Sequence, residues 1–576
     1  MTDMKQGRRL FKSSFFSITT KAGKQIWLTL SFVLIFIFFL VPIIRLFLLS
    51  LSVEGGHIFS NYYSILHEAR TWKIIANTAI IVVGSTTIAL VVGVLLAWLI
   101  SYSDIRAKRW LILLVMIPFI IPSYIVTLSW TQFLSKKGWL AQGFSQIMVG
   151  FEPFNLYSHT GIIIILGLSH YPLVFLLTMS VLRRIPRELE WAVQASGGNR
   201  WTVFRKITLP LALPGIASGG MLAFLANLDN FGIPAFLGIP AKITVLSTAI
   251  YQEVVGFGPT AFARAATFSV ILAIIALIGT VLQWFFLRKA NYSESVIDKR
   301  PRVTFGKKRI LIEISLWAIL IFISIIPLFS MFATSVIRAY GLPFTIDNIT
   351  FNHYKFLLLE NSKVQGAILT SIKLAIGTSL FCLFAGTALA YYRIRRQNRV
   401  GKGMELSVGL PYALPGMVLA LAMILSWMQP IPGWNPGIYG SIWILFIAYI
   451  TRFMILQVRG SMTAMSQIDP AMEEAAQVFG AKGFSKWRKI MLPLLLPGLL
   501  SGTFLVMLTA LTELTVSALL WSSGSETIGL TIFNFEQAGY TTFSTAFSSL
   551  IVVALLMGGL SLIWLQGIYQ KKVGQV

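Results

Sequence analysis

The chain has 576 residues, of which 56% are hydrophobic and 12% are charged, and its mean hydropathy is +0.77. Apolar runs longer than the ~18 residues that can cross a bilayer recur along it, which excludes an ordinary soluble domain. The net charge of +26 would suggest a nucleic-acid partner in a soluble protein, and the single cysteine, Cys382, excludes a disulfide framework and a paired-cysteine metal site.

Twelve membrane-spanning helices are predicted from the hydropathy of the chain. The first contains IWLTLSFVLIFIFFLVPII from Ile26, which is longer than the apolar core of a signal peptide and is expected to be retained. With the N-terminus in the cytoplasm, most Lys and Arg fall in cytoplasmic segments, as the positive-inside rule requires, so we expect a lipid bilayer around the chain and no nucleic-acid partner. The predicted spans are 26–52, 73–101, 110–134, 160–182, 211–231, 265–287, 310–336, 366–392, 404–428, 438–458, 494–520 and 545–569.

The sequence consists of two homologous halves, so the expected fold is an all-α, polytopic membrane protein with a six-helix repeat. VVGSTTIALVVGVLLAWLI from Val82 parallels AIGTSLFCLFAGTALAYYR from Ala375, and IPFIIPSYIV from Ile117 parallels LPYALPGMVL from Leu410. Because six is even, both halves enter the membrane in the same direction and would line one pathway where they meet. The expected parts are a cytoplasmic tail at 1–25, a first half at 26–287, a basic cytoplasmic linker at 288–309, a second half at 310–570 and a cytoplasmic tail at 571–576.

A charged segment between the fourth and fifth spans of each half interrupts the apolar pattern. The copies are EWAVQASGGNRWTVFRKITLPLALPGI from Glu190 and EEAAQVFGAKGFSKWRKIMLPLLLPGL from Glu473. In the second copy, Asp469 and Pro470 favour the start of a short helix, and Gly480 favours its end. Such a helix, held between two spans, could dock on a cytoplasmic partner. A helix lying on the membrane surface is the alternative for one copy, and the repetition counts against it.

The second copy resembles the signature of permease subunits of bacterial ABC importers: Glu-Ala-Ala, three residues, Gly, nine residues, Ile-x-Leu-Pro. The matching residues are Glu474, Ala475, Ala476, Gly480, Ile490, Leu492 and Pro493. The resemblance implies a type I ABC importer permease fold in a bacterial inner (cytoplasmic) membrane. It implies that this segment is the coupling helix, which sits in a cleft of the ATP-binding subunit. The implied partners are two copies of that subunit and an extracytoplasmic substrate-binding protein.

The first copy departs from this signature. Gly197 and Ala192 match it, whereas Trp191 replaces the Glu and Val193 the last Ala, and Glu190 aligns with Glu473. We therefore hypothesise that the two docking sites are unequal. The candidate coupling residues are Glu190, Trp191, Ala192, Gly197, Glu473, Glu474, Ala475, Ala476 and Gly480.

An ATP site is not expected within this chain. Gly-Lys occurs at Gly23, Gly306 and Gly401, but Ser or Thr does not follow in a phosphate-binding loop. We expect no catalytic residue, no metal site and no bound cofactor, with ATP and Mg²⁺ used by the partner ATPase.

Polar residues within the spans are candidates for the translocation pathway, because charge in lipid costs a few kcal/mol or more. They are His170, Asp229, Asn230, Arg452 and Glu513. Helix ends that already reach water would explain Asp229, Asn230 and Glu513 equally well. A buried pair or a side chain snorkelling to the interface would explain Arg452.

The substrate is the least determined feature. The fused length, together with FGIPAFLGIP from Phe231 and TELTVSALLWSSGSETIGLTIFNFEQAGY from Thr512, resembles the permeases of ferric iron importers. Importers of thiamine, 2-aminoethylphosphonate and polyamines have similar permeases and stay open. An ion-coupled secondary transporter would explain the spans but not the paired charged loops. A membrane enzyme would need an acid–base or metal constellation that the sequence does not offer.

Overall fold

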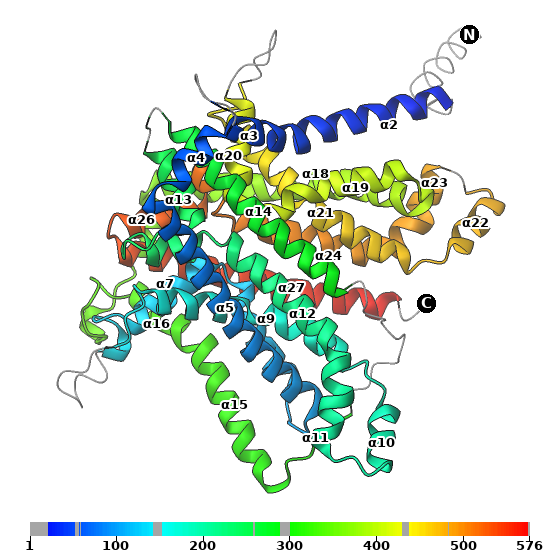
Figure 1. Ribbon diagram of the computed structural model, residues 1–576, viewed down its shortest axis with the longest axis horizontal. Coiled ribbons are helices and arrows are strands. Elements are labelled where there is room, and N and C mark those ends of the chain that lie inside the picture. Colours follow the sequence, from blue (N-terminus) through cyan, green and yellow to red (C-terminus); the bar gives the residue numbers. More distant parts are fainter. Residues whose placement is uncertain are drawn as a thin grey trace, which may run out of the picture.

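The computed structural model describes residues 21–51, 57, 59–141, 153–256, 258, 260–287, 300–428, 437–481 and 483–573. The regular secondary structure of these residues is helical, and two isolated bridges are the only β-type pairings among them. The expectations for 1–20, most of the linker and the last three residues lie outside the described residues. Figure 1 shows long helices running side by side between two ends of the molecule.

The first half contains six helical regions that correspond to the predicted spans, joined by short helices. Three π-helical turns interrupt the α-helices, and two of them, η1 and η2, lie within continuous helical stretches. The elements are α2 (Lys21–Ile35), η1 (Phe36–Leu40), α3 (Val41–Leu51), α4 (Ser60–Leu66), α5 (Ala69–Tyr102), α6 (Lys108–Ile120), α7 (Ser123–Leu134), α9 (His159–Leu182), α10 (Arg187–Ala195), α11 (Arg200–Val203), η2 (Phe204–Thr208), α12 (Leu209–Asp229), η3 (Pro234–Gly238), α13 (Leu246–Val255) and α14 (Ala261–Leu287).

The second half repeats this order. Its elements are η4 (Gly306–Lys308), α15 (Arg309–Ser324), α16 (Ile326–Ser335), η5 (Ile346–Asn348), α17 (Asn352–Lys355), η6 (Phe356–Glu360), α18 (Ser362–Arg396), α19 (Arg399–Ala413), α20 (Gly416–Trp427), α21 (Ile442–Ser466), α22 (Pro470–Val478), α23 (Phe484–Lys486), η7 (Trp487–Met491), α24 (Leu492–Leu511), α25 (Ser517–Leu520), α26 (Ile528–Gln537) and α27 (Thr541–Val573).

Two of the twelve predicted spans are broken. Ten helices of the described residues are long and apolar enough to cross a membrane, and the pairs α6–α7 and α19–α20 pass only together, with bends of 102° and 108°. Both breaks lie before a proline: Ile121 precedes Pro122, Leu414 precedes Pro415, and both preceding residues are extended. A proline disfavours helical geometry in the residue before it, so each pair bends there. The total is twelve only if each bent pair counts as one span.

The two halves exchange their first helices. The first span packs on the second half, where Phe38 stacks on Trp427 at 5.4 Å and Arg45 Nη1 donates to the carbonyl of Ser426 at 2.9 Å. In return, Ser324 Oγ of α15 donates to the carbonyl of Leu114 in the first half at 2.9 Å. The halves are therefore interlocked. Arg45 supplies a hydrogen-bond donor to a backbone carbonyl group at the C-terminal end of α20.

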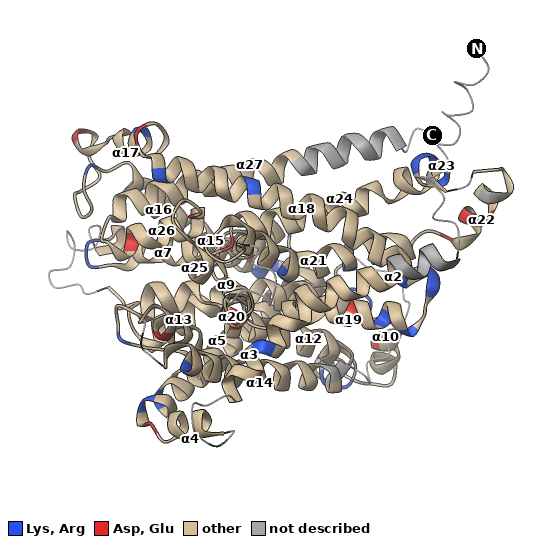
Figure 2. Cartoon of the chain, turned by 90° about the horizontal axis from the view of Figure 1, so that it is seen from above, with Lys and Arg blue, Asp and Glu red and all other residues tan. Residues whose placement is uncertain are grey.

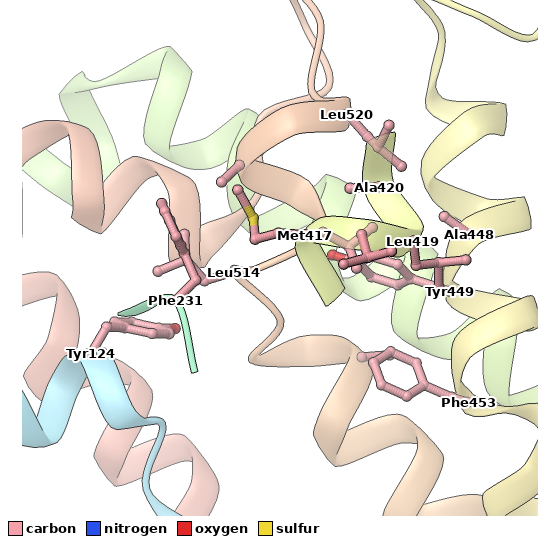
Figure 3. Close-up of a cluster of buried hydrophobic side chains, with 14 of the residues drawn as sticks. Tyr124, Phe231, Met417, Leu419, Ala420, Ala448, Tyr449, Phe453, Leu514 and Leu520 are labelled. Carbon is pink, nitrogen blue, oxygen red and sulfur yellow. The ribbon is translucent and has the colours of Figure 1, made fainter. Parts of the chain in front are cut away.

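The largest buried cluster crosses the boundary between the halves. Tyr124 and Phe231 of the first half belong to the same cluster as Met417, Tyr449 and Leu514 of the second. Figure 3 shows these side chains around α20 and its neighbours. Because lipid provides no hydrophobic drive for helices to associate, this contact depends on close van der Waals packing.

Candidate functional site

The two repeated loops lie at the same end of the molecule. We define the first repeated loop as residues 187–208 and the second as residues 470–491. Their helices, α10 and α22, lie toward the right of Figure 1, and α17 lies at the opposite end in Figure 2. Basic side chains also gather near α10, α19 and α23 (Figure 2). Both loops therefore lie at one end of the molecule, close to these basic side chains.

A glycine ends the short helix in both loops. Gly197 follows α10 with φ +83°, and Gly480 follows α22 with φ +81°. This left-handed region is open to glycine without steric cost, which explains why both copies carry this residue at the same place. Asn199 then caps α11 by accepting a hydrogen bond from the Thr202 N–H at 2.9 Å. A π-helical turn leads into the next span in each half.

In the second loop, a buried glutamate attaches α22 to the body of its own half. Glu473 Oε2 accepts from Lys486 Nζ at 2.9 Å, and Glu473 Oε1 accepts from Arg395 Nε at 2.6 Å. The Tyr391 hydroxyl also donates to Oε2 at 3.3 Å. Burial alone would raise the pKa of Glu473, but the hydrogen bonds from Lys486 and Arg395 outweigh it and hold this pKa below its ordinary value. The carboxylate therefore stays ionised and paired.

In the first loop, the aligned glutamate is paired differently. Glu190 Oε1 accepts from Arg302 Nη1 at 2.7 Å and from the Tyr102 hydroxyl at 3.0 Å. The side chains of Glu190 and Arg302 are only 9% and 6% exposed. When the halves are aligned, Tyr102 and Val203 stand where the second half has Arg395 and Lys486. The first half thus lacks both cations, and the segment between the halves supplies one.

The described end of the linker binds alongside this ion pair. The Tyr102 carbonyl accepts the N–H groups of Arg302 and Val303 at 2.7 and 2.9 Å, and the Asp104 N–H donates to the Val303 carbonyl at 3.1 Å. From α10, Arg187 Nη2 donates to the Pro301 carbonyl at 2.9 Å. Arg302 was not among the residues predicted from the sequence. The signal that could have identified it is that Tyr102 and Val203 replace the cations Arg395 and Lys486, which leaves Glu190 in need of a cation from elsewhere.

The candidate coupling residues divide into a buried and an exposed group. Glu190, Glu473 and Ala476 face inward, whereas Trp191, Ala192, Glu474 and Ala475 are exposed. Trp191 and its counterpart Glu474 thus place an indole and a carboxylate at equivalent positions. The second loop further exposes Val478 and Phe479. The two loops therefore present chemically different surfaces.

Among the candidate pathway residues, Asp229 and Arg452 join the two halves. Arg452 Nη2, near the middle of α21, donates to Asp229 Oδ2 at 2.7 Å, and the Gly416 N–H donates to Asp229 Oδ1 at 2.5 Å. The Arg452 side chain is 9% exposed. Arg452 is therefore buried and paired, whereas the Asp229 side chain is 35% exposed, and snorkelling does not describe Arg452. The end of α12 in the first half is attached to the start of α20 in the second.

The other three candidates bond within their own half. Asn230 Oδ1 accepts the Ile233 N–H at 2.9 Å, and the corresponding Glu513 accepts the N–H groups of Val516 and Ser517 at 2.8 and 3.0 Å. Both therefore order the turn after a span. His170 Nδ1 lies 2.7 Å from Asn227 Oδ1. Within the described residues, His, Cys, Asp and Glu side chains do not gather in threes as they would around a metal ion.

Two interlocked helical halves, each with a glutamate-attached helix at the same end, define a two-half membrane permease. Residues 89–290 and 382–575 match the family described as "Binding-protein-dependent transport system inner membrane component", and together these segments exceed half of the chain. The chain belongs to this family.

The curated relatives include several permeases of ferric iron systems. "Ferric transport system permease protein FbpB" of Actinobacillus pleuropneumoniae is 26% identical over 78% of this chain and 65% of its own length. "Putative ferric transport system permease protein FbpB 1" of Haemophilus influenzae is 27% identical over 73% and 66%. The match thus spans just under two thirds of these two relatives. "Fe(3+)-transport system permease protein FbpB 2" of Haemophilus influenzae is 22% identical over 92% and 96%. A solved chain of a bacterial alginate ABC transporter, in complex with an alginate pentasaccharide-bound periplasmic protein, gives a TM-score of 0.40 at 21% identity, covering 48% of this chain and 99% of that one.

Proposed function

We propose that this chain is the permease of an ATP-driven importer in the bacterial cell membrane, with both termini on the cytoplasmic side. The observation that carries the proposal is the duplicated loop, in which an exposed helix is attached through a buried carboxylate to the body of the protein. Two copies of an ATP-binding subunit would each bind one loop, using ATP and Mg²⁺. An extracytoplasmic binding protein would deliver the substrate, and the family description supports that partner.

The attachment of each loop indicates how movement would reach the membrane. A push on α22 is transmitted through Glu473 to Arg395 at the end of α18, and to Lys486 before α24. A push on α10 is transmitted through Glu190 to Tyr102 at the end of α5 and to Arg302. Because a buried ion pair resists separation by several kcal/mol, these contacts move the spans with the loops.

The substrate must then pass between the halves. The contact of Asp229 with Arg452 and Gly416 closes that boundary near the middle of α21. Opening the pathway requires this contact to separate, and the freed carboxylate and guanidinium would then face the passing substrate. Binding energy from the delivered substrate and its carrier would offset the separation.

Ferric iron is the substrate that we propose, supported by the names of the relatives. The test is uptake of labelled ferric iron by cells that lack this protein, complemented with wild type, Glu474→Arg or Gly480→Pro. Wild type should restore uptake, and both variants should fail at matched expression. Glu360→Arg is the control, because Glu360 is exposed, follows α17 at the opposite end and forms only an exposed ion pair.

Each other outcome identifies the part that is wrong. If wild type restores no iron uptake, the substrate is wrong, and the same cells are tested with thiamine, 2-aminoethylphosphonate and polyamines. If both loop variants transport as wild type does, the coupling role of the loops is wrong. Full transport by the purified chain without an ATPase would make it an ion-coupled secondary transporter.

A further inference from the structure

A large groove lies between the first span and the second half. It has a volume of about 1750 Å³ and runs between α2 and the helices α18, α19 and α21. The first span touches the second half closely around Phe38 and Phe39, but toward its N-terminus Leu30, Phe32 and Leu34 are exposed. Figure 1 shows α2 leaving the body beside α18 and α19. The groove is therefore a wedge that opens toward the end carrying the repeated loops.

The walls of this wedge are apolar along most of their length. Phe32 and Ile35 line it from α2, Phe381 and Leu389 from α18, and Phe446 from α21. At membrane depth such walls favour hydrocarbon over water. Their span along α18, from Phe381 to the end of the helix, suits acyl chains that lie parallel to the helices.

The mouth of the wedge is basic. Arg396 and Arg399 line it where α18 ends and α19 begins, both are exposed, and neither forms an ion pair with an acidic residue in the described part of the chain. The turn between them is fixed, because Gln397 has φ +45° and Asn398 Oδ1 accepts the Gly401 N–H at 2.8 Å. Two guanidinium groups at the end of an apolar groove form a phosphate-binding arrangement.

We propose that this groove is a binding site for an anionic phospholipid of the leaflet on the side of the repeated loops. Its acyl chains lie between α2 and α18, and its phosphate lies between Arg396 and Arg399. A zwitterionic lipid fits the walls but offers no net charge to the two arginines. The site itself does not depend on the proposed transport function.

A lipid bound in this groove would also stabilise the attachment of the second loop. Arg395, which holds Glu473, lines the groove next to Arg396. A lipid phosphate on Arg396 would order the end of α18 and so keep Arg395 in place. This step rests on the proposed coupling role of α22.

The test is native mass spectrometry of the full chain in detergent, titrated with phosphatidylglycerol or phosphatidylcholine. We expect phosphatidylglycerol to bind more tightly, and the double variant Arg396→Gln, Arg399→Gln to bind it about 25-fold more weakly, from two contacts of roughly 1 kcal/mol each. The double variant Lys307→Gln, Lys308→Gln is the matched control, because it removes two exposed charges away from the groove. It should bind as wild type does.

A second variant separates the acyl chains from the headgroup. Ala388 lines the groove, and Ala388→Phe fills it while leaving both arginines in place. It should reduce phosphatidylglycerol binding, and inorganic phosphate should not compete. Equal binding of both lipids, unchanged by either groove variant, would mean non-specific lipid around the helices and overturn the proposal. Competition by inorganic phosphate would overturn it in favour of a simple anion site. Wild-type iron uptake by the Arg396→Gln, Arg399→Gln variant after its lipid binding is lost would contradict the coupling step alone and leave the lipid site standing.

Discussion

Replacing Arg302 with Met should detach the first repeated loop from the body of the protein. The substitution keeps an unbranched side chain that fills the space of the arginine stem but removes the only cation paired with Glu190 among the described residues. The Tyr102 hydroxyl stays as a donor at 3.0 Å. The backbone bonds of residues 302 and 303 to the Tyr102 carbonyl do not depend on the side chain.

The size of the effect follows from burial. Removing one partner of a buried ion pair costs about 3–5 kcal/mol, because the other charge stays in a poorly solvated position. In the second loop, Lys486→Met leaves Glu473 with Arg395 and Tyr391, so we expect only the loss of one charged hydrogen bond, about 1.5–3 kcal/mol. The first loop should therefore be the more sensitive of the two.

A buried reporter cysteine measures this detachment. Ser103 is fully buried and pairs with Val303 of the linker, so Ser103→Cys becomes reactive when the linker lifts. Cys382 is replaced by Ala so that the reporter is the only thiol. At about 1.4 kcal/mol per tenfold, the loss of about 3–5 kcal/mol in Arg302→Met should speed maleimide labelling by roughly 10²- to 4 × 10³-fold.

The second loop provides the comparison. Ala476→Cys is the equivalent reporter there, since Ala476 is buried on the inner face of α22. Labelling of this cysteine should rise roughly ten- to a hundred-fold with Lys486→Met. Labelling of Ser103→Cys that stays at the wild-type rate in Arg302→Met would refute the reasoning, because the linker would then be held by its backbone alone.

Three further outcomes are expected. Arg452→Met should weaken the contact between the halves by about 1–2 kcal/mol. In the complex with its proposed ATP-binding subunits, the rate of ATP hydrolysis without binding protein should then rise roughly 5- to 30-fold. An unchanged rate would contradict the proposed opening. Because the pKa of Glu473 is lowered from 4.5 and that of Lys486 is raised from 10.5, their pair should stabilise α22 fully between these values. The stabilisation should be lost as pH falls through the pKa of Glu473 or rises through that of Lys486, so a loss of protease protection near pH 7 would oppose it. Gly480→Ala should cost about 1–2 kcal/mol of loop stability from its φ of +81°, whereas Gly558→Ala in α27 should cost nothing measurable by thermal unfolding.

Much of the architecture follows from patterns that are local in the sequence. Hydropathy predicts the spans, because a segment in lipid must form its backbone hydrogen bonds internally and therefore crosses as a continuous apolar helix. The repeat places the two loops in equivalent positions, and the glycines at 197 and 480 mark where their helices end. The prolines at 122 and 415 mark the two bends in the sequence. Hydropathy averaged over a window measures only how apolar a segment is, so it cannot distinguish a straight span from one that bends by about 100°.

The remaining features depend on which distant residues meet. Asp229 and Arg452 were each candidates, but their pairing across the halves comes from the packing of α12 against α20 and α21. The exchange of first helices has no local signature, because an apolar surface in lipid packs equally well on either half. For the same reason, Arg45 could not be assigned to the Ser426 carbonyl from its own span.

Arg302 shows why the join between the halves matters to the first loop. In the second half, both cations on Glu473 come from the same half, through α18 and α23. In the first half, the cation comes from the linker between the halves, so the ion pair of the first loop depends on the segment that joins them. The chemical difference between Trp191 and Glu474 on the exposed faces then adds to a difference already present in how the two loops are attached.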